Sequence, residues 1–259
     1  MAIHSFLHWP VQTSALRGTP ALKDPRLVTT PAKQAELIND LWRFFEVKGR
    51  GEFSLGYLDL GAAWRTRFVE LCNAGHMQRD RLLDASLAAL NRDFNEAETR
   101  CFVRLYTELE PTAEEQHVRC GKLLALLDAE VSSTVSFAVK AIKQLNKHDP
   151  IPAADLIKAL RPVFLSPGKG VVMDAIGLVK DAAKRAPDTK PEAIDAIMQA
   201  LRHKHESVSN ASLAALENWA ADLDPKALRE LQASVPALLP SVQARALALL
   251  DTTGRAALS

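Results

Sequence analysis

The stretch FLSPGKGVVMDAI, residues 164–176, places Gly168, Lys169 and Gly170 directly before an apolar run with helical spacing. A glycine-rich loop with a lysine could bind nucleotide phosphates, but the Walker pattern also needs an earlier glycine and a hydroxyl residue after the lysine. Phe164 and Gly170 occupy those two places, and the preceding segment has a helical pattern. We therefore expect a turn between helices with a solvated lysine. The alternative is an anion held by Lys169 and the N–H groups of a helix N-terminus.

Two other pairs of residues have types that serve in metal binding or catalysis. His203 and His205 form an H-x-H pair at an expected helix end, where cations complement the helix dipole; a metal site would need further ligands that the sequence does not indicate. Glu114 and Glu115 fall in the first turn of an expected helix, where negative charge is stabilising without any catalytic role. We expect no metal and no cofactor.

Trp219 and Asp222 lie three residues apart on an expected helix. HEAT-like alkylpurine DNA glycosylases use aromatic and acidic residues around a damaged base, so this pair is a candidate for such chemistry. Packing of Trp219 in the core is the simpler interpretation. Cys101 and Cys120 lie among apolar residues and are expected to be buried thiols, and with Cys72 they show no C-x-x-C spacing that would indicate zinc or disulfides. We expect no catalytic residues and no enzyme activity.

Helical signals cover most of the chain, and no segment has a convincing strand pattern. Residues 1–30 lack a clean period and are expected to form an irregular arm. Residues 31–110 form an N-terminal helical region. Residues 111–259 form a repeat region continuous with it. Expected helix starts in this last region fall near Thr112, Pro152, Pro191 and Pro225, at spacings typical of HEAT-type helical pairs.

The second helix of each pair shares a pattern in which a valine is followed three residues later by an alanine. The pairs are Val135 with Ala138, Val172 with Ala175, and Val208 with Ala211. A branched and a small residue on one face would let neighbouring helices approach closely. The sequence therefore predicts an all-α fold, an α-solenoid of antiparallel helical hairpins with HEAT-like repeats.

The register of Val135 with Val172 also aligns exposed lysines on neighbouring helices. Lys143 matches Lys180, and Lys147 matches Lys184. Lys140 lies on the same helical face as Lys143 and Lys147. These five residues are a candidate patch for an anionic partner, an acidic protein surface or a phosphate-bearing ligand. The alternative is a solvated flank. In the next repeat, Leu216 and Ala220 fall at the matching positions, so we expect the patch to end there.

Charge and hydropathy restrict the partners. With 32 basic and 31 acidic residues the net charge is +1, which leaves no global field favouring nucleic acid, so nucleic-acid binding is not expected. Neither a signal-peptide pattern nor a long apolar run indicates secretion or membrane insertion, and we expect a cytoplasmic protein. The last segment, SVQARALALLDTTGRAALS, has apolar residues around the helix and predicts self-association or docking through this end.

Three stretches resemble a known family in order and spacing. They are the R-D-x-L-L-D start at Arg79–Asp84, the L-x-P-T-x-E-E helix entry at Leu109–Glu115, and the P-x-K turn at Pro167 and Lys169. Over residues 35–220 the chain is similar to a bacterial family called domain of unknown function 6493. The resemblance implies a HEAT-like helical fold and carries no established activity or catalytic residues.

The function expected from these observations is a non-enzymatic scaffold or adaptor that binds another protein along its stacked helices. The alternative is a DNA-binding or DNA-repair module of HEAT-like repeats, which would need a basic, aromatic-lined face. A hydrolase or a nucleotide-driven enzyme is a third and weaker hypothesis.

Overall fold

A computed structural model describes residues 38–39, 41–46 and 63–256. These residues are all-helical, and no strand occurs among them, as the sequence predicts. The expected irregular arm, residues 1–30, lies outside the described residues. The chain divides into two compact units, unit 1 up to Lys122 and unit 2 from Leu123, with the division inside one short helix.

Unit 1 is built from short helices with well-defined ends. They are η3 (Trp42–Phe45), α4 (Ala63–Asn73), α5 (Arg79–Leu90), α6 (Glu96–Glu108), α7 (Ala113–Val118) and the first part of α8 (Cys120–Ala125). Gly75 follows α4 with a φ of 74°, a left-handed conformation that glycine adopts without steric cost, and it stops the helix. Asn95 and Glu98 form a capping box that starts α6.

The core of unit 1 is aromatic. Phe45 lies 5.4 Å from both Phe68 and Phe102, measured between ring centroids, and Phe94 lies 5.1 Å from Phe102. All four side chains are buried. Tilted and edge-on aromatic pairs at such distances add to the stabilisation that burial gives. The short 3₁₀ helix η3 is thereby anchored to α4 and α6.

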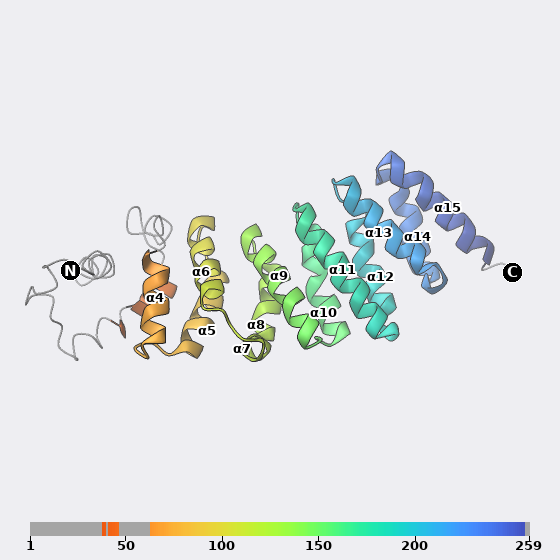
Figure 1. Cartoon of the computed structure of the whole chain (residues 1–259). Coiled ribbons are helices and arrows are strands. Elements are labelled where there is room, and N and C mark those ends of the chain that lie inside the picture. The colour runs from red at the N-terminus through yellow and green to blue at the C-terminus, as the bar shows by residue number, and fades with distance from the viewer. Residues whose placement is uncertain (1–37, 40, 47–62, 257–259) are drawn as a thin grey trace, which may run out of the picture. The chain divides into compact units, whose positions relative to one another are not determined.

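Unit 2 consists of helical hairpins arranged in two layers. Its helices are η6 (Leu126–Asp128), α9 (Ser132–His148), α10 (Ala153–Leu160), η7 (Arg161–Leu165), α11 (Lys169–Arg185), η8 (Pro187–Thr189), α12 (Lys190–Ala200), α13 (Glu206–Asn218), η9 (Ala220–Asp222), α14 (Pro225–Ser234), η10 (Val235–Ala237) and α15 (Pro240–Ala256). Helices α10, α12 and α14 pack side by side and form what we call the A layer. Helices α9, α11, α13 and α15 form the B layer, which lies in front of the A layer in Figure 1.

The four expected helix starts are confirmed. Thr112 caps α7 with a capping box, Pro152 precedes α10, Pro191 lies in the first turn of α12, and Pro225 is the first residue of α14. Asp224 adds a side-chain cap, since its carboxylate accepts a hydrogen bond from the Ala227 N–H at 2.7 Å. Proline and capping residues at these places set where each helix begins because the first-turn N–H groups have no helical acceptor.

Burial confirms the predicted register of α9 with α11 and corrects that of α13. Val135 and Ala138 on α9, like Val172 and Ala175 on α11, are at most 7% exposed. On α13, however, Ala211 is only half-buried. Its expected place is taken by Ser212, which is fully buried together with Ser209. The true register of α13 is shifted by one residue. The positions that match Lys180 and Lys184 are therefore Glu217 and Ala221, and the predicted match with Leu216 and Ala220 was wrong.

The last helix is covered on one side by its neighbours. Val242, Ala246 and Leu249 are buried, and α15 packs against α13 and α14. Leu250 is half-buried, and Leu247 is 51% exposed. Ala244 and Ala248 are exposed as well, so apolar residues do lie around the helix as predicted, and the largest of them on the outer side is Leu247. Self-association through this end stays a prediction.

Among the described residues, no helix combines the length and the apolar character needed to cross a bilayer.

Candidate functional site

The glycine-lysine stretch forms a turn, as predicted. The 3₁₀ helix η7 precedes it, Gly168 occupies the N-cap position, and α11 begins at Lys169. The Gly168 N–H donates to the Ser166 hydroxyl at 3.3 Å, which closes the turn locally. Lys169 is exposed. The loop is not preceded by a strand, so it lacks the context of a nucleotide-binding phosphate loop.

The histidine pair supports this same turn. His203 Nδ1 accepts a hydrogen bond from the His205 backbone N–H at 3.1 Å, which leaves the proton on Nε2 in the neutral ring. Nε2 then donates to the Ser166 carbonyl oxygen at 3.0 Å. Both ring nitrogens of His203 are occupied, so neither has a lone pair for a metal. In the described part of the chain, no cluster of histidine, cysteine and carboxylate side chains could hold a metal ion.

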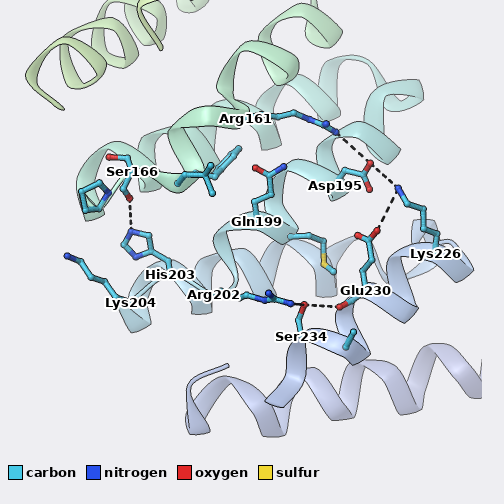
Figure 2. A pocket seen from close by; sticks show the side chains of 15 residues that line it. Arg161, Ser166, Asp195, Gln199, Arg202, His203, Lys204, Lys226, Glu230 and Ser234 are labelled. Atoms are coloured by element: carbon cyan, nitrogen blue, oxygen red, sulfur yellow. Dashed lines mark hydrogen bonds and ion pairs between the residues drawn. The ribbon is translucent and has the colours of Figure 1, made fainter. Parts of the chain in front are cut away.

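A groove of about 850 Å³ crosses the surface of the A layer (Figure 2). Its walls come from η7 with the following turn, from α12 with the turn after it, and from α14. We call it the A-layer groove. It spans three successive elements of one layer, and the sequence analysis did not find it because its residues are far apart in the chain.

One end of the A-layer groove is electrically neutralised. Asp195 on α12 lies 3.6 Å from both Arg161 and Lys226, and Lys226 lies 3.8 Å from Glu230. These four side chains, two cations and two carboxylates, are all partly exposed. They link η7, α12 and α14 across the groove, and Figure 2 shows them as one chain of contacts. Exposed pairs of this kind add little stability but leave no free charge at this end.

The other end of the A-layer groove carries cations without a carboxylate partner. Arg202 donates to the Ser234 hydroxyl at 3.1 Å, and that hydroxyl donates to the Glu230 carbonyl oxygen at 2.8 Å. A neutral acceptor thus orients the guanidinium without cancelling its charge. Lys204 is exposed nearby, and within the described residues neither cation forms an ion pair. Gln199 projects into the groove between the two ends (Figure 2).

Apolar surface lies beside these polar groups. Leu165 at the end of η7 is 77% exposed, whereas Phe164 and Met198 are largely buried and form the apolar floor. The arrangement combines an apolar contact, an amide, and an oriented but unneutralised cation. Chemically, this set can bind a carboxylate next to an apolar side chain.

The five predicted lysines are all exposed, and three of them line a second groove. Lys143 and Lys147 on α9 and Lys184 on α11 line a groove of about 560 Å³ between these two helices. We call it the B-layer groove. Lys140 and Lys180 lie on the same helices but do not line it. The structure thus brings together part of the predicted set.

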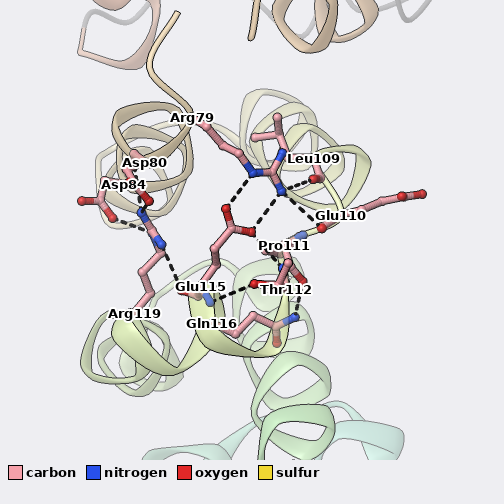
Figure 3. A network of polar contacts seen from close by, with 10 residues as sticks. All are labelled: Arg79, Asp80, Asp84, Leu109, Glu110, Pro111, Thr112, Glu115, Gln116 and Arg119. Atoms are coloured by element: carbon pink, nitrogen blue, oxygen red, sulfur yellow. Dashed lines mark hydrogen bonds and ion pairs between the residues drawn. The ribbon is translucent and has the colours of Figure 1, made fainter. Parts of the chain in front are cut away.

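The helix start of α7 is held by an ion pair to α5 in unit 1 (Figure 3). Arg79 binds both carboxylate oxygens of Glu115, at 2.6 and 3.0 Å, and also donates to the Leu109 carbonyl oxygen at 2.7 Å. Glu115 in turn accepts from the Thr112 N–H at 2.9 Å in the capping box. The hydrogen bond from Arg79 lowers the pKa of Glu115 despite partial burial. Capping is confirmed as a role of Glu115.

A second arginine, Arg119, closes the same region. Its guanidinium is buried and donates to Asp84 at 2.7 Å and to the side chain and backbone of Asp80 at 2.9 and 3.0 Å. It also donates to the Glu115 carbonyl oxygen at 3.0 Å. Burial opposes the charge, but the two aspartates outweigh it and raise the pKa of Arg119. We call Arg79, Asp80, Asp84, Glu115 and Arg119 the unit 1 network.

One known protein family matches about half of the chain. The model of the family described as domain of unknown function 6493 (DUF6493) matches residues 37–168. The chain belongs to this family. No curated protein and no solved structure matches it significantly. The match ends near the turn before α11, short of the residue 220 expected from sequence.

Four residues of the motifs that suggested DUF6493 belong to the unit 1 network. Arg79, Asp80 and Asp84 come from the R-D-x-L-L-D start, and Glu115 comes from the helix entry. In this DUF6493 chain these motif residues therefore link helices to each other. Arg119 was missed by sequence reasoning, because a lone arginine in a polar segment resembles a surface residue.

The remaining candidate residues of the DUF6493 chain lie at helix ends, in ion pairs or in the protein interior. Trp219 caps the C-terminus of α13 and is half-buried, and Asp222 lies in η9, so the expectation of one helix carrying both was wrong. Asp222 is paired with Lys190 at 2.7 Å. Cys101 is buried, which raises the pKa of its thiol to about 11 and disfavours the reactive thiolate. Cys120 is half-buried rather than buried.

Proposed function

We propose that this DUF6493 chain is a non-enzymatic scaffold in which unit 2 is a HEAT-like α-solenoid, and that the A-layer groove binds a segment of a partner protein. The hairpins α10–α11, α12–α13 and α14–α15 and the matched burial of α9 and α11 support the repeat interpretation. Stacked hairpins offer extended surfaces that cross several repeats, which is how such proteins bind partners.

The observation that carries the proposal is the unneutralised end of the A-layer groove. Arg202 is held by Ser234 in a fixed orientation and keeps its full charge, next to a leucine that is 77% exposed. A free arginine side chain would lose rotamer entropy on binding a carboxylate, but an oriented one has lost part of it already. The groove of about 850 Å³ has the size of a site for a short peptide segment.

The chemistry of the groove defines the expected partner. Its segment should carry an apolar side chain for Leu165 and an aspartate, glutamate or C-terminal carboxylate for Arg202. At the other end Asp195 and Glu230 already neutralise the cations, so additional acidic residues there would gain nothing. This polarity sets the direction in which a segment would lie.

Binding fits the groove better than catalysis or DNA recognition does. Both ring nitrogens of His203 are engaged by the turns around it, so it is not poised as a general base. The carboxylates Asp195 and Glu230 would repel a phosphate backbone that followed the groove, and net charge is near zero. These carboxylates favour a peptide over DNA as the ligand of the A-layer groove.

A photo-crosslinking experiment tests the proposal. A crosslinking amino acid at position 165 should capture a partner segment in the native host, and the same amino acid at Val118, which is 74% exposed in unit 1, is the matched control. The captured segment should contain an apolar residue next to a carboxylate. As a synthetic peptide it should bind the purified protein and lose about tenfold affinity with Arg202→Gln. A captured segment without a carboxylate, or peptide binding that ignores Arg202→Gln, would refute the assignment.

A further inference from the structure

The B-layer groove lies on the other layer of unit 2 from the A-layer groove. Its residues come from α9 and α11 alone, whereas the A-layer groove is formed by η7, α12, α14 and adjacent turns. The two grooves share no lining residue. Whatever occupies one groove therefore leaves the lining of the other free.

One part of the B-layer groove contains a neutralised lysine, and the other part contains cations that are not neutralised. Near the middle of α9, Lys143 is paired with Asp174 of α11. Toward the ends of both helices the groove contains Lys147, Lys184 and Arg185, and none of these three forms an ion pair within the described residues. Cations in the last turn of a helix are stabilised by its dipole, which accounts for each residue by itself. The groove brings the cations of two helices together.

Arg185 is held in the same manner as Arg202 in the A-layer groove. One terminal nitrogen donates to the Asn146 side-chain oxygen at 3.2 Å and the other to the Ile151 carbonyl oxygen at 3.4 Å. The Asn146 oxygen is itself fixed, since it accepts from the Ile151 N–H at 3.0 Å. Neutral acceptors again orient a guanidinium and leave its charge intact. This second observation, independent of the lysines, indicates a site rather than a solvated flank.

Gly177 opens the wall of the groove on α11. Glycine inside a helix costs about 1 kcal/mol relative to alanine, so it usually has a structural reason. A Cβ added at this position would meet no atom within 4 Å, so close packing of α9 against α11 is not that reason. The missing side chain instead leaves room above the helix backbone, between Asp174 and Asp181.

We propose that the B-layer groove binds an acidic segment of a partner protein, with its carboxylates at Lys147, Lys184 and Arg185 and its backbone passing over Gly177. Three unneutralised cations against the single unpaired carboxylate of Asp181 give the complementary charge. A peptide is favoured over nucleic acid because Asp174 and Asp181 flank the narrow passage at Gly177, where a regular phosphate backbone would meet them. This proposal does not depend on the A-layer groove.

A labelled peptide tests the site directly. The probe is a fluorescein-labelled heptapeptide of glutamates and aspartates with one central leucine, followed by fluorescence anisotropy at about 50 mM salt, where exposed charges are weakly screened. We expect Lys147→Glu with Lys184→Glu to weaken binding at least about tenfold. Gly177→Leu should block the passage and weaken binding similarly. It should not lower the thermal midpoint, because leucine favours helix and meets no neighbour at its Cβ.

A control on the same helix distinguishes blocking from general effects. Gly170→Leu also places a side chain where a Cβ meets no atom within 4 Å, but it lies outside the groove and should leave binding unchanged. Equal binding by the wild type, the lysine double variant and the Gly177 variant would overturn the proposal. So would loss of binding with Arg202→Gln alone, which would assign the probe to the A-layer groove. Stronger competition by a short oligothymidylate than by unlabelled peptide would also overturn it in favour of nucleic acid.

Discussion

Arginines in the two units of this chain are held by different partners. In unit 1, Arg79 and Arg119 are bound by the carboxylates of Glu115, Asp80 and Asp84, so their charges are cancelled inside the protein. The grooves of unit 2 instead orient Arg185 and Arg202 through amide, carbonyl and hydroxyl oxygens. The first arrangement fixes helices to one another, and the second fixes a cation while its charge remains available to a ligand.

Unit 2 also contains arginines of the first kind: Arg161 pairs with Asp195 at the neutralised end of the A-layer groove, and a second arginine links two helices. Arg245 on α15 binds both oxygens of Glu217 on α13, at 3.1 and 2.6 Å, and donates to Asn210 at 2.9 Å. It lines neither groove. The difference is therefore between arginines paired with carboxylates and arginines held by neutral acceptors, rather than between units, and each prediction below tests one side of it.

The largest effect should follow from changing the packed layers themselves. Ala175→Glu places a carboxylate at a fully buried position of α11, where neighbouring helices leave no room or partner. We expect a loss of several kcal/mol in the free energy of unfolding, about 3 or more. Ala221→Glu, at an exposed position of the same unit, should change it by about 0.5 kcal/mol or less. Urea unfolding followed by circular dichroism measures both, and equal small losses would show that the layer register is wrong.

Removing Arg119 should have the next largest effect. Arg119→Ala removes the donor to Asp80 and to the Glu115 carbonyl oxygen, leaves Asp84 paired with Lys122 alone at 2.9 Å, and removes a side chain that is 4% exposed. Because Asp80 remains 84% exposed and can be solvated, we expect about 2 kcal/mol rather than the full cost of a broken buried pair. Hydrogen exchange of the α7 amides should accelerate in line with this loss of stability. A loss below about 0.5 kcal/mol would mean that this link is a surface contact.

Acid should weaken the unit 1 network through Glu115. Arg79 lowers the pKa of Glu115 below its ordinary value of 4.5, so the carboxylate stabilises the fold above that value and the contribution is lost as pH falls through the lowered pKa. Wild-type α7 amides should therefore lose protection from exchange on acidification below about pH 4.5. Glu115→Gln has no carboxylate to protonate at this position. The protection of its α7 amides should therefore decrease less steeply on acidification. Parallel profiles for both proteins would contradict the role of Glu115.

Groove residues should have the smallest effect on stability. Arg202→Gln removes a charge that has no carboxylate partner among the described residues, and Lys143, Lys147, Lys180 and Lys184 changed together to Glu alter exposed side chains. Each protein should unfold within about 1 kcal/mol of the wild type. The quadruple variant loses the link between Lys143 and Asp174, so it should be the less stable of the two. A loss of unfolding free energy as large as that of Arg119→Ala would show that the groove residues serve to hold the fold together.

Local sequence signals were sufficient for the helix starts but not for the α13 register. Proline and capping residues act on the turn in which they stand, so their positions could be read directly. The register of α13 was placed one residue off because several small residues compete there for the buried face. Ser209 and Ser212 are buried since their hydroxyls donate to backbone carbonyls of His203 and Val208, which makes them compatible with a core.

The grooves and the network depend on contacts between distant residues. Arg119 differs in no local feature from an exposed arginine, and its carboxylate partners Asp80 and Asp84 lie on another helix. In the same way nothing near Arg202 in the sequence points to Ser234. The predicted lysine patch was partly found, since helical spacing and layer register place Lys147 and Lys184 in one groove. The pairing of Lys143 with Asp174 needed the side-chain positions.

Arginine side-chain NMR tests the central distinction most directly. In a protein with ¹⁵N-labelled arginines, the Nε–Hε signals of Arg79, Arg119, Arg185 and Arg202 can be assigned by substitution and followed while the acidic heptapeptide is added. The account predicts that the signal of Arg185 shifts and gains protection from exchange, whereas those of Arg79 and Arg119 are protected from the start and do not move. Shifts confined to Arg79 and Arg119, or a spectrum that the peptide leaves unchanged, would contradict it.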